Sequence, residues 1–135
     1  MLPPFDESGN LPAGIHRCDF AELSARFGHG SPERDVEVRE LEEMIAWARR
    51  AGVRRIIVNG SFVTAKVAPN DVDIVLLPGP DYPQDQVPLG DEAERRWPFL
   101  QVILAADDTD LETWATRDFG TDRLRRAKGV VEVIP

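Results

Sequence analysis

Apolar residues recur at helical spacing between Val38 and Ala48. They fall three or four positions apart, as expected for one buried face of an α-helix. Ser31 and Pro32 supply an N-cap and a first-turn proline ahead of this stretch, and Gly52 can end the helix behind it. The pattern therefore predicts a long helix between Ser31 and Gly52.

A shorter helix is predicted after Asp19, a good N-cap residue that Glu22 follows three positions later in the capping-box pattern. Gly28 can end this helix. Residues 2–16 have no clear period and hold three prolines and two glycines, so we expect an extended N-terminal arm there. The apolar stripe of the short helix consists of Phe20, Leu23 and Phe27.

Four apolar runs follow the long helix and are predicted to be strands. Short helices are expected at 91–96 and at 109–117, the second with Thr109 as its cap. The stretch 78–90 holds four prolines and two glycines. It is therefore predicted to be a loop, with Pro78 ending the second strand. The strand runs are 53–58, 74–77, 99–106 and 128–134.

This order of elements predicts an α+β fold in which helices pack on a small mixed β-sheet. The length of 135 residues indicates a single domain over 1–135. An arm and a short helix (1–30) would precede a core (31–106), and a last helix and strand (107–135) would complete the domain. Three tryptophans are expected in the core or at its rim: Trp47, Trp97 and Trp114.

The overall charge narrows the classes of function. The formal net charge is −8, with 24 acidic against 16 basic residues, so broad nucleic-acid binding is not expected.

No apolar run approaches the ~20 residues of a membrane span, and the acidic, proline-rich start does not resemble a secretory signal. The single cysteine, Cys18, has no internal partner for a disulfide. We therefore expect a cytoplasmic protein.

Two acids stand at the start of the predicted strand 74–77. Nine residues separate Asp71 from Ser61. Side chains at i and i+2 of a strand share a face, so Asp71 and Asp73 would lie about 6 Å apart and repel each other by roughly 3 kcal/mol at an effective dielectric near 20. A bridging divalent cation would turn this repulsion into binding. The two residues are therefore candidate ligands for Mg²⁺ (or Mn²⁺).

The residues between the two strands are suited to binding phosphate. Gly60 lacks a Cβ atom, so the backbone can bend sharply and a ligand can approach it closely. Ser61 offers a backbone N–H and a hydroxyl to a phosphate oxygen, and Lys66 could reach the same phosphates. Asn59 could brace the turn through hydrogen bonds to its neighbours.

The combination of Gly60–Ser61 with Asp71 and Asp73 resembles the nucleotidyltransferase superfamily typified by the polymerase β palm. In that superfamily a Gly-Ser turn precedes an Asp-x-Asp pair flanked by apolar residues. More narrowly, the chain is similar to small bacterial single-domain members that share three further segments. The resemblance implies the polymerase β-like fold, a nucleoside triphosphate as substrate, Mg²⁺, and transfer of a nucleotidyl group to an acceptor (a protein, an RNA or a small molecule), with pyrophosphate leaving. The shared segments are Leu11 to Gly14, Asn59 to Phe62 and Lys128 to Val130.

Active members of this superfamily carry a third carboxylate on the next strand, and this chain has Gln101 at the expected position. An amide oxygen can ligate a metal, but an amide cannot act as a base. Asp107 lies about 20 Å further along an extended strand, and it is expected to begin the following helix instead. Catalysis therefore stays an open question at this point.

Three hypotheses follow. The first is an active Mg²⁺-dependent nucleotidyltransferase with Asp71, Asp73 and Gln101 at its centre. The second is a catalytically impaired binding module on the same fold, for example one half of a toxin–antitoxin pair with a protein partner. The third is a structural α+β domain without a ligand. The basic cluster before the last strand is interpreted as a solvated turn, although it could also grip a nucleotide tail, an RNA end or an acidic partner. It consists of Arg123, Arg125, Arg126 and Lys128.

Overall fold

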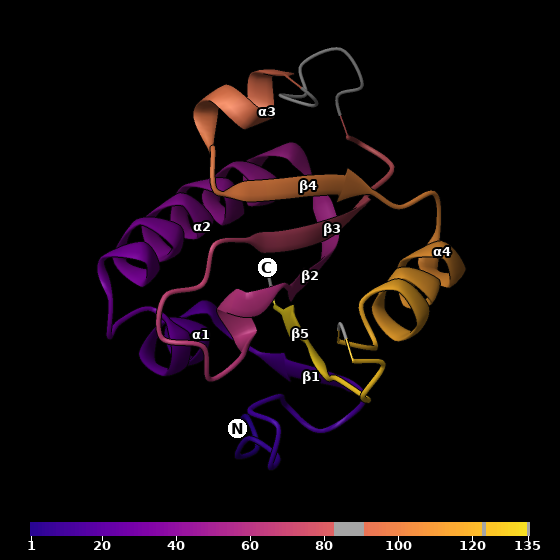
Figure 1. Cartoon of the computed structure of the whole chain (residues 1–135). Helices are drawn as coiled ribbons and strands as arrows, with labels where there is room; N and C mark the ends of the chain where they lie inside the picture. The colour runs from indigo at the N-terminus through magenta and orange to yellow at the C-terminus, as the bar shows by residue number, and fades with distance from the viewer. Residues whose placement is uncertain (83–90, 123, 135) are drawn as a thin grey trace.

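A computed structural model describes residues 1–82, 91–122 and 124–134, and within them five strands form one mixed sheet (Figure 1). The strand order is β1-β5-β2-β3-β4. The central strand β2 runs antiparallel to both β3 and β5, whereas β1 is parallel to β5 and β4 is parallel to β3. The bounds are Ile15–Cys18 for β1, Val53–Asn59 for β2, Val72–Pro78 for β3, Leu100–Leu104 for β4 and Val130–Val133 for β5.

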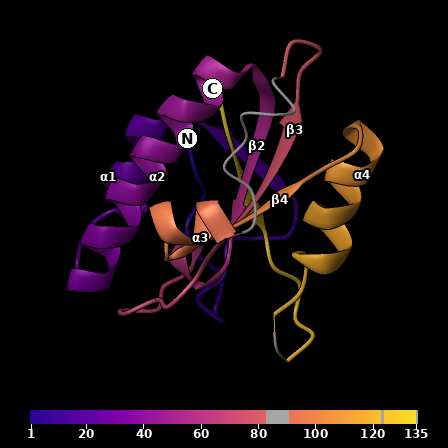
Figure 2. The same ribbon diagram turned by 90° about the horizontal axis from the view of Figure 1, so that it is seen from above.

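Helices cover both faces of this sheet. Figure 2 shows α1 and α2 on one side of it and α4 on the other. The chain is thus a mixed α+β domain, and this part of the sequence-based prediction is confirmed. The bounds are Phe20–Phe27 for α1, Pro32–Ala51 for α2, Asp91–Arg96 for α3 and Asp108–Thr113 for α4, which continues into a π-helical turn at Trp114–Asp118.

The capping signals that the sequence gives for the first two helices are confirmed. The Asp19 side chain accepts a hydrogen bond from the Glu22 backbone N–H at the start of α1. Ser31 likewise accepts from the Arg34 N–H, and Gly52 ends α2 in the left-handed conformation with φ at 81°. These caps satisfy backbone groups that a helix end would otherwise leave unpaired.

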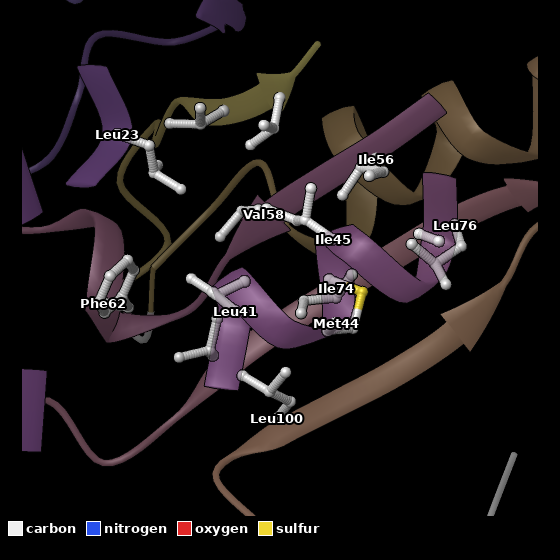
Figure 3. Close-up of a cluster of buried hydrophobic side chains, with 14 of the residues drawn as sticks. Leu23, Leu41, Met44, Ile45, Ile56, Val58, Phe62, Ile74, Leu76 and Leu100 are labelled. Atoms are coloured by element: carbon white, nitrogen blue, oxygen red, sulfur yellow. The ribbon is translucent and has the colours of Figure 1, made fainter. Parts of the chain in front are cut away.

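Each face of the sheet has its own apolar core because side chains alternate along a strand. The larger core lies under α1 and α2, and Figure 3 shows Leu41, Met44 and Ile45 of α2 against side chains of β2 and β3. The smaller core lies under α4. Trp97 is fully buried in the larger core, while Trp47 packs at its edge and Trp114 at the edge of the smaller one. The smaller core includes Ile57, Val75, Leu77, Leu111 and Val130.

Two details of the predicted elements were wrong. Ile15 and His16, predicted to end the extended arm, belong with residues 17 and 18 to β1. This strand was missed because it pairs with β5, more than a hundred residues away, and has no local period of its own. The cap of α4 is Asp107 and not Thr109, since the Asp107 side chain accepts from the Asp110 N–H. Pro78 ends β3 as predicted, but residues 83–90 of the predicted loop lie outside the described residues.

No helix within the described residues combines the length and the apolar character that a membrane span needs.

The alternation also determines which polar side chains share a face. Ile57 belongs to the core under α4, so Arg55 and Asn59, two positions before and after it on β2, point to that same face. Asp73 pairs with Asn59 across the antiparallel ladder and therefore points there too. The face under α4 thus carries polar side chains at both ends of its small apolar core.

Candidate active site

The turn after β2 requires a glycine at position 60. Gly60 has φ at 90°, a region that side-chain-bearing residues rarely adopt. A Cβ atom there would lie 2.8 Å from the Asp71 carbonyl oxygen and 3.0 Å from Asp71 Oδ2. The missing side chain therefore lets the start of β3 approach the turn closely. This brings the Asp71 carboxylate against Gly60.

The carboxylates of Asp71 and Asp73 converge beside this turn. Asp71 Oδ1 accepts a 2.6 Å hydrogen bond from Ser61 Oγ, and Asp73 lines the same cavity as Asp71. Burial, and then the neighbouring Asp71 carboxylate, raise the pKa of Asp73 to about 6. The two acids therefore lie side by side in one cavity although their charges oppose it.

Gly60, Ser61, Lys66 and both acids line one cavity of about 480 Å³. The sequence predicted these five residues as a metal and phosphate site, and the fold brings them together. Lys66 is exposed at the rim of the cavity. The segment that follows α4 also lines the cavity, with Phe119, Thr121, Asp122, Leu124 and Arg126.

Lys128 is the residue of this site that sequence reasoning misjudged. Its predicted place was a solvated turn, but it is only 9% exposed and lines the cavity with the two acids. Its Nζ donates to the Gly60 carbonyl oxygen at 3.2 Å, and its backbone N–H donates to the Gly120 carbonyl. Arg125 and Arg126 of the same cluster are exposed, as predicted, and Arg123 lies outside the described residues.

Asn59 contributes a polar atom that has no partner. The side chain is 4% exposed and lines the cavity, and its Oδ1 has no hydrogen-bond donor among the described residues. A buried acceptor without a donor is costly. A ligand that donates a hydrogen bond to this oxygen, or a cation that the oxygen coordinates, would remove that cost.

The donor set in the cavity fits Mg²⁺. Two adjoining carboxylates and an amide oxygen without a donor are hard oxygen ligands of the type that Mg²⁺ prefers. Within the described residues no group of three or more His, Cys, Asp or Glu side chains could hold a metal. Asp71 and Asp73 would be the carboxylate ligands of a cation at this place, and Mg²⁺ sites that also bind substrate phosphates commonly use one or two carboxylates.

A buried arginine on α2 holds the loop that follows the turn. Arg34 is 6% exposed, and its guanidinium donates to the carbonyl oxygens of Phe62, Thr64 and Lys66 at 2.7 to 2.8 Å. A fourth bond, to the Phe27 carbonyl, links the guanidinium to the end of α1. Arg34 therefore fixes the backbone path from Ser61 to Lys66. Its helical position is visible in the sequence, but its partners are not.

Gln101 lies beside the site but outside its cavity. It pairs with Asp73 in the parallel register between β3 and β4, so both side chains point to the same face of the sheet. Gln101 is exposed and lines a neighbouring cavity of about 610 Å³ together with Asp71 and Phe99. The expected register is present, but Gln101 does not line the cavity in which the two acids meet Lys128.

Cys18 has no part in this site. It is 4% exposed in the larger core, and burial raises the pKa of its thiol to about 11. A thiol of this kind is unreactive.

The fold and the site together define a small α+β domain with a two-carboxylate cavity at a glycine turn. Residues 3–134 match a family of unknown function, DUF6932, and the chain belongs to that family. Neither a curated protein nor a solved structure matches the chain.

Proposed function

We propose that the protein is a Mg²⁺-dependent nucleotidyltransferase with a polymerase β-like fold. The observation that most supports this proposal is the position of the Asp71 carboxylate. It lies against Gly60, accepts a hydrogen bond from Ser61, and shares one cavity with Asp73. The arrangement of the strands supports the fold assignment. Gly60 and Ser61 connect two antiparallel strands, the acids stand at the start of the second, and a parallel strand follows beside it.

The residues of the cavity would have separate roles in this reaction. Asp71 and Asp73 would hold Mg²⁺ (or Mn²⁺), and the turn at Gly60 and Ser61 would hold the phosphates of a nucleoside triphosphate. When bound, the ion would neutralise charge on the reacting phosphate. The acceptor oxygen would form a bond to the α-phosphorus, the bond to the bridging oxygen would break, and pyrophosphate would leave.

The direct test is incubation of the full chain with each of four nucleoside triphosphates labelled at the α-phosphate. The reaction should contain Mg²⁺ or Mn²⁺ and, as acceptors, the protein itself and an RNA mixture. We expect label to reach one acceptor in the wild type and not in Asp71→Ala. Asp35→Asn is a matched control, because Asp35 is an exposed acid in the first turn of α2.

Absence of label from every acceptor would contradict the enzyme if Asp71→Ala also leaves metal-dependent nucleotide binding unchanged. The structural domain without a ligand would then be the better hypothesis. A rise in melting temperature with Mg²⁺ and nucleotide would speak against that last hypothesis, because a ligand that binds only the folded state stabilises it.

A second candidate is a nucleotide-binding module that has lost catalysis and serves a protein partner, such as one half of a toxin–antitoxin pair. The observation that favours it is Gln101, which faces the same side of the sheet as Asp73 but lies outside the cavity and cannot take a proton from an acceptor.

Two substitutions at Gln101 separate these candidates. If the module is a decayed enzyme, Gln101→Asp or Gln101→Glu should create or raise transfer activity by about a hundredfold, the usual contribution of a general base. If glutamine is the working residue, both variants should lose activity. A stable partner that co-purifies from the native host would favour the module.

A further inference from the structure

Lys128 is a buried cation in a cavity that holds two acids. Its backbone is fixed on two sides, because its N–H bonds to the Gly120 carbonyl and the N–H of Gly129 bonds to the Leu11 carbonyl of the N-terminal arm. Its Nζ donates to the Gly60 carbonyl at 3.2 Å. An ammonium has three donors, so one carbonyl does not saturate it. The group is thus held at the turn with capacity for another acceptor.

The charges of the cavity balance only while no metal is present. By formal charge, Asp71 and Asp73 contribute two negative charges to the lining of the cavity, and Lys66 and Lys128 contribute two positive ones. Arg126 and Asp122, which also line the cavity, neutralise each other in an ion pair at 2.7 Å. A divalent cation bound to the two acids would leave two positive charges in excess. The ammonium of Lys128 would then oppose the cation unless an anion accompanied it.

We propose that Lys128 is a phosphate-binding residue of this cavity, and that its fixed charge makes the cavity bind a divalent cation and a polyphosphate together and neither one well alone. This inference rests on the proposed function, and it names the polyphosphate as the part of the substrate that the site recognises. The Gly60 carbonyl holds Nζ in place until phosphate oxygens arrive.

The chemistry of the anion follows from the charge and the donors. An excess of two positive charges is best neutralised by an anion with two or more charges, which favours a polyphosphate over a carboxylate. The Ser61 hydroxyl donates to Asp71 here and can turn to a phosphate oxygen once a cation holds that carboxylate, and Asn59 provides an amide within the same cavity. Lys128 is better placed than Lys66 for this role because a buried, fixed ammonium loses less side-chain entropy on binding than an exposed one.

The test measures binding without any transfer reaction. Isothermal titration at pH 8 would use three probes on the full chain: Mn²⁺ alone, tripolyphosphate alone in the presence of a chelator, and the preformed complex of the two. We expect the complex to bind wild type at least about tenfold more tightly than either component. The two ligands must strengthen each other equally if the coupling is thermodynamic.

Lys128→Met should change two affinities in opposite directions. The complex should bind about tenfold to a hundredfold more weakly, the range for one charge-assisted hydrogen bond, whereas Mn²⁺ alone should bind several-fold more tightly because the opposing charge is gone. Lys128→Arg, which keeps the charge, should retain the coupling in part. Arg50→Met removes one exposed positive charge near the end of α2, before β2 begins, and should change neither affinity.

Thermal unfolding of each variant shows whether it is folded, and the wild-type titrations stand even if a variant is not. Mn²⁺ that binds wild type as tightly alone as in the complex would overturn the inference. So would a Lys128→Met variant that binds complex and Mn²⁺ like wild type, which would make Lys128 a structural residue only. Coupled binding without transfer to any acceptor would support the inference and contradict the enzyme. Nucleotidyl transfer without coupled binding would support the enzyme and overturn the inference about Lys128.

Discussion

Two charged clusters lie on the same face of the sheet, at opposite ends of the small core under α4, and their charges are compensated to different degrees. At one end Glu132 of β5 accepts two hydrogen bonds from Arg55 of β2, at 2.7 and 3.0 Å, and Asp108 accepts a third hydrogen bond from Arg55 at 3.1 Å. At the other end Asp71 and Asp73 line one cavity side by side, and Lys128 of the same cavity donates to the Gly60 carbonyl.

The difference is visible in the ionisation of each cluster. Hydrogen bonds to Glu132 raise the pKa of Arg55 above its usual value, so its charge is favoured by the fold. Burial and the neighbouring Asp71 raise the pKa of Asp73 to about 6, so its charge is disfavoured by the fold. One cluster stabilises the structure in the absence of any ligand. The other is strained without one, as expected of a binding site.

The largest expected effect is at Asp71, Asp73 and Lys128, which we call the uncompensated cluster. Asp73→Asn should reduce nucleotidyl transfer by about a thousandfold, comparable with the removal of a main electrostatic group from an active site. It should not weaken the fold. Because the pKa of Asp73 is raised, its ionisation costs stability above about pH 6, and the variant should gain about 1 kcal/mol at pH 8. Urea unfolding at pH 8 and the labelled-triphosphate assay measure the two effects.

The same substitution at an acid outside the cavity provides the control for Asp73→Asn. Asp35→Asn should leave both transfer and the free energy of unfolding near their wild-type values. A loss of more than about 1 kcal/mol of stability in Asp73→Asn would show that the acid is a structural residue, and the contrast between the clusters would then disappear.

At Glu132, Arg55 and Asp108, which we call the compensated cluster, a substitution should affect stability alone. Glu132→Gln leaves Arg55 without its buried partner, because Glu132 is 3% exposed while Asp108 is largely in solvent. We expect a loss of about 3 kcal/mol in the free energy of unfolding, the lower part of the range for breaking a buried ion pair. Transfer activity per folded molecule should be unchanged.

A double substitution sharpens the test at Glu132. Arg55→Met with Glu132→Leu replaces the pair with apolar side chains and should recover much of the lost stability. Failure to recover it would mean that the outer partners, Asp108 and Glu112 for Arg55 and Arg17 for Glu132, contribute more to stability than the Arg55–Glu132 pair itself.

Local signals in the sequence were enough for most of the fold. The caps at Asp19, Ser31 and Gly52 and the runs that became β2 and β3 depend on residues only a few positions apart. β1 was missed for the opposite reason. Its four residues are held by pairing with β5 at the far end of the chain, and no local pattern reports such a pairing.

The residues of the candidate site also fall into two groups, those that local spacing in the sequence places correctly and one that it does not. Gly60, Ser61, Asp71 and Asp73 share one turn and its two strands, so their spacing placed them together correctly. Lys128 reaches the site only because β5 lies beside β2, and in the sequence it is one of four neighbouring basic residues. The burial that distinguishes it from Arg125 and Arg126 is a property of the assembled sheet.

Glu37 allows a third test of the contrast between the two clusters, with an effect smaller than those expected at Asp73 and Glu132. Glu37 on α2 is fully buried, and neither carboxyl oxygen has a hydrogen-bond partner among the described residues. Burial raises the pKa of Glu37 to about 7; Arg34 opposes this, whereas Asp71, Glu33 and Glu40 add to it. Its contribution to stability is therefore complete below the unfolded value of 4.5 and is lost as the pH rises through about 7.

Glu37→Gln should remove this loss. Between about pH 5 and pH 8 the free energy of unfolding of wild type should fall relative to the variant by on the order of 2 kcal/mol. Urea unfolding of both proteins at the two pH values measures the difference, and groups common to both cancel. Glu42→Gln, an exposed acid on the same helix, is the control. A constant difference between wild type and Glu37→Gln would show that Glu37 is ionised with a partner at both pH values.

The smallest expected effect separates the two lysines of the cavity. Lys66 is exposed, so water and salt screen its charge. Lys66→Met should weaken binding of the Mn²⁺–tripolyphosphate complex only about twofold to threefold, the size of a surface ion pair, and high salt should abolish even this difference. The effect of Lys128→Met should be larger and should persist in salt, because the ammonium is buried. If Lys66→Met had the greater effect, the anion would lie over the loop instead of beside the two acids, and the uncompensated cluster would not be the binding site.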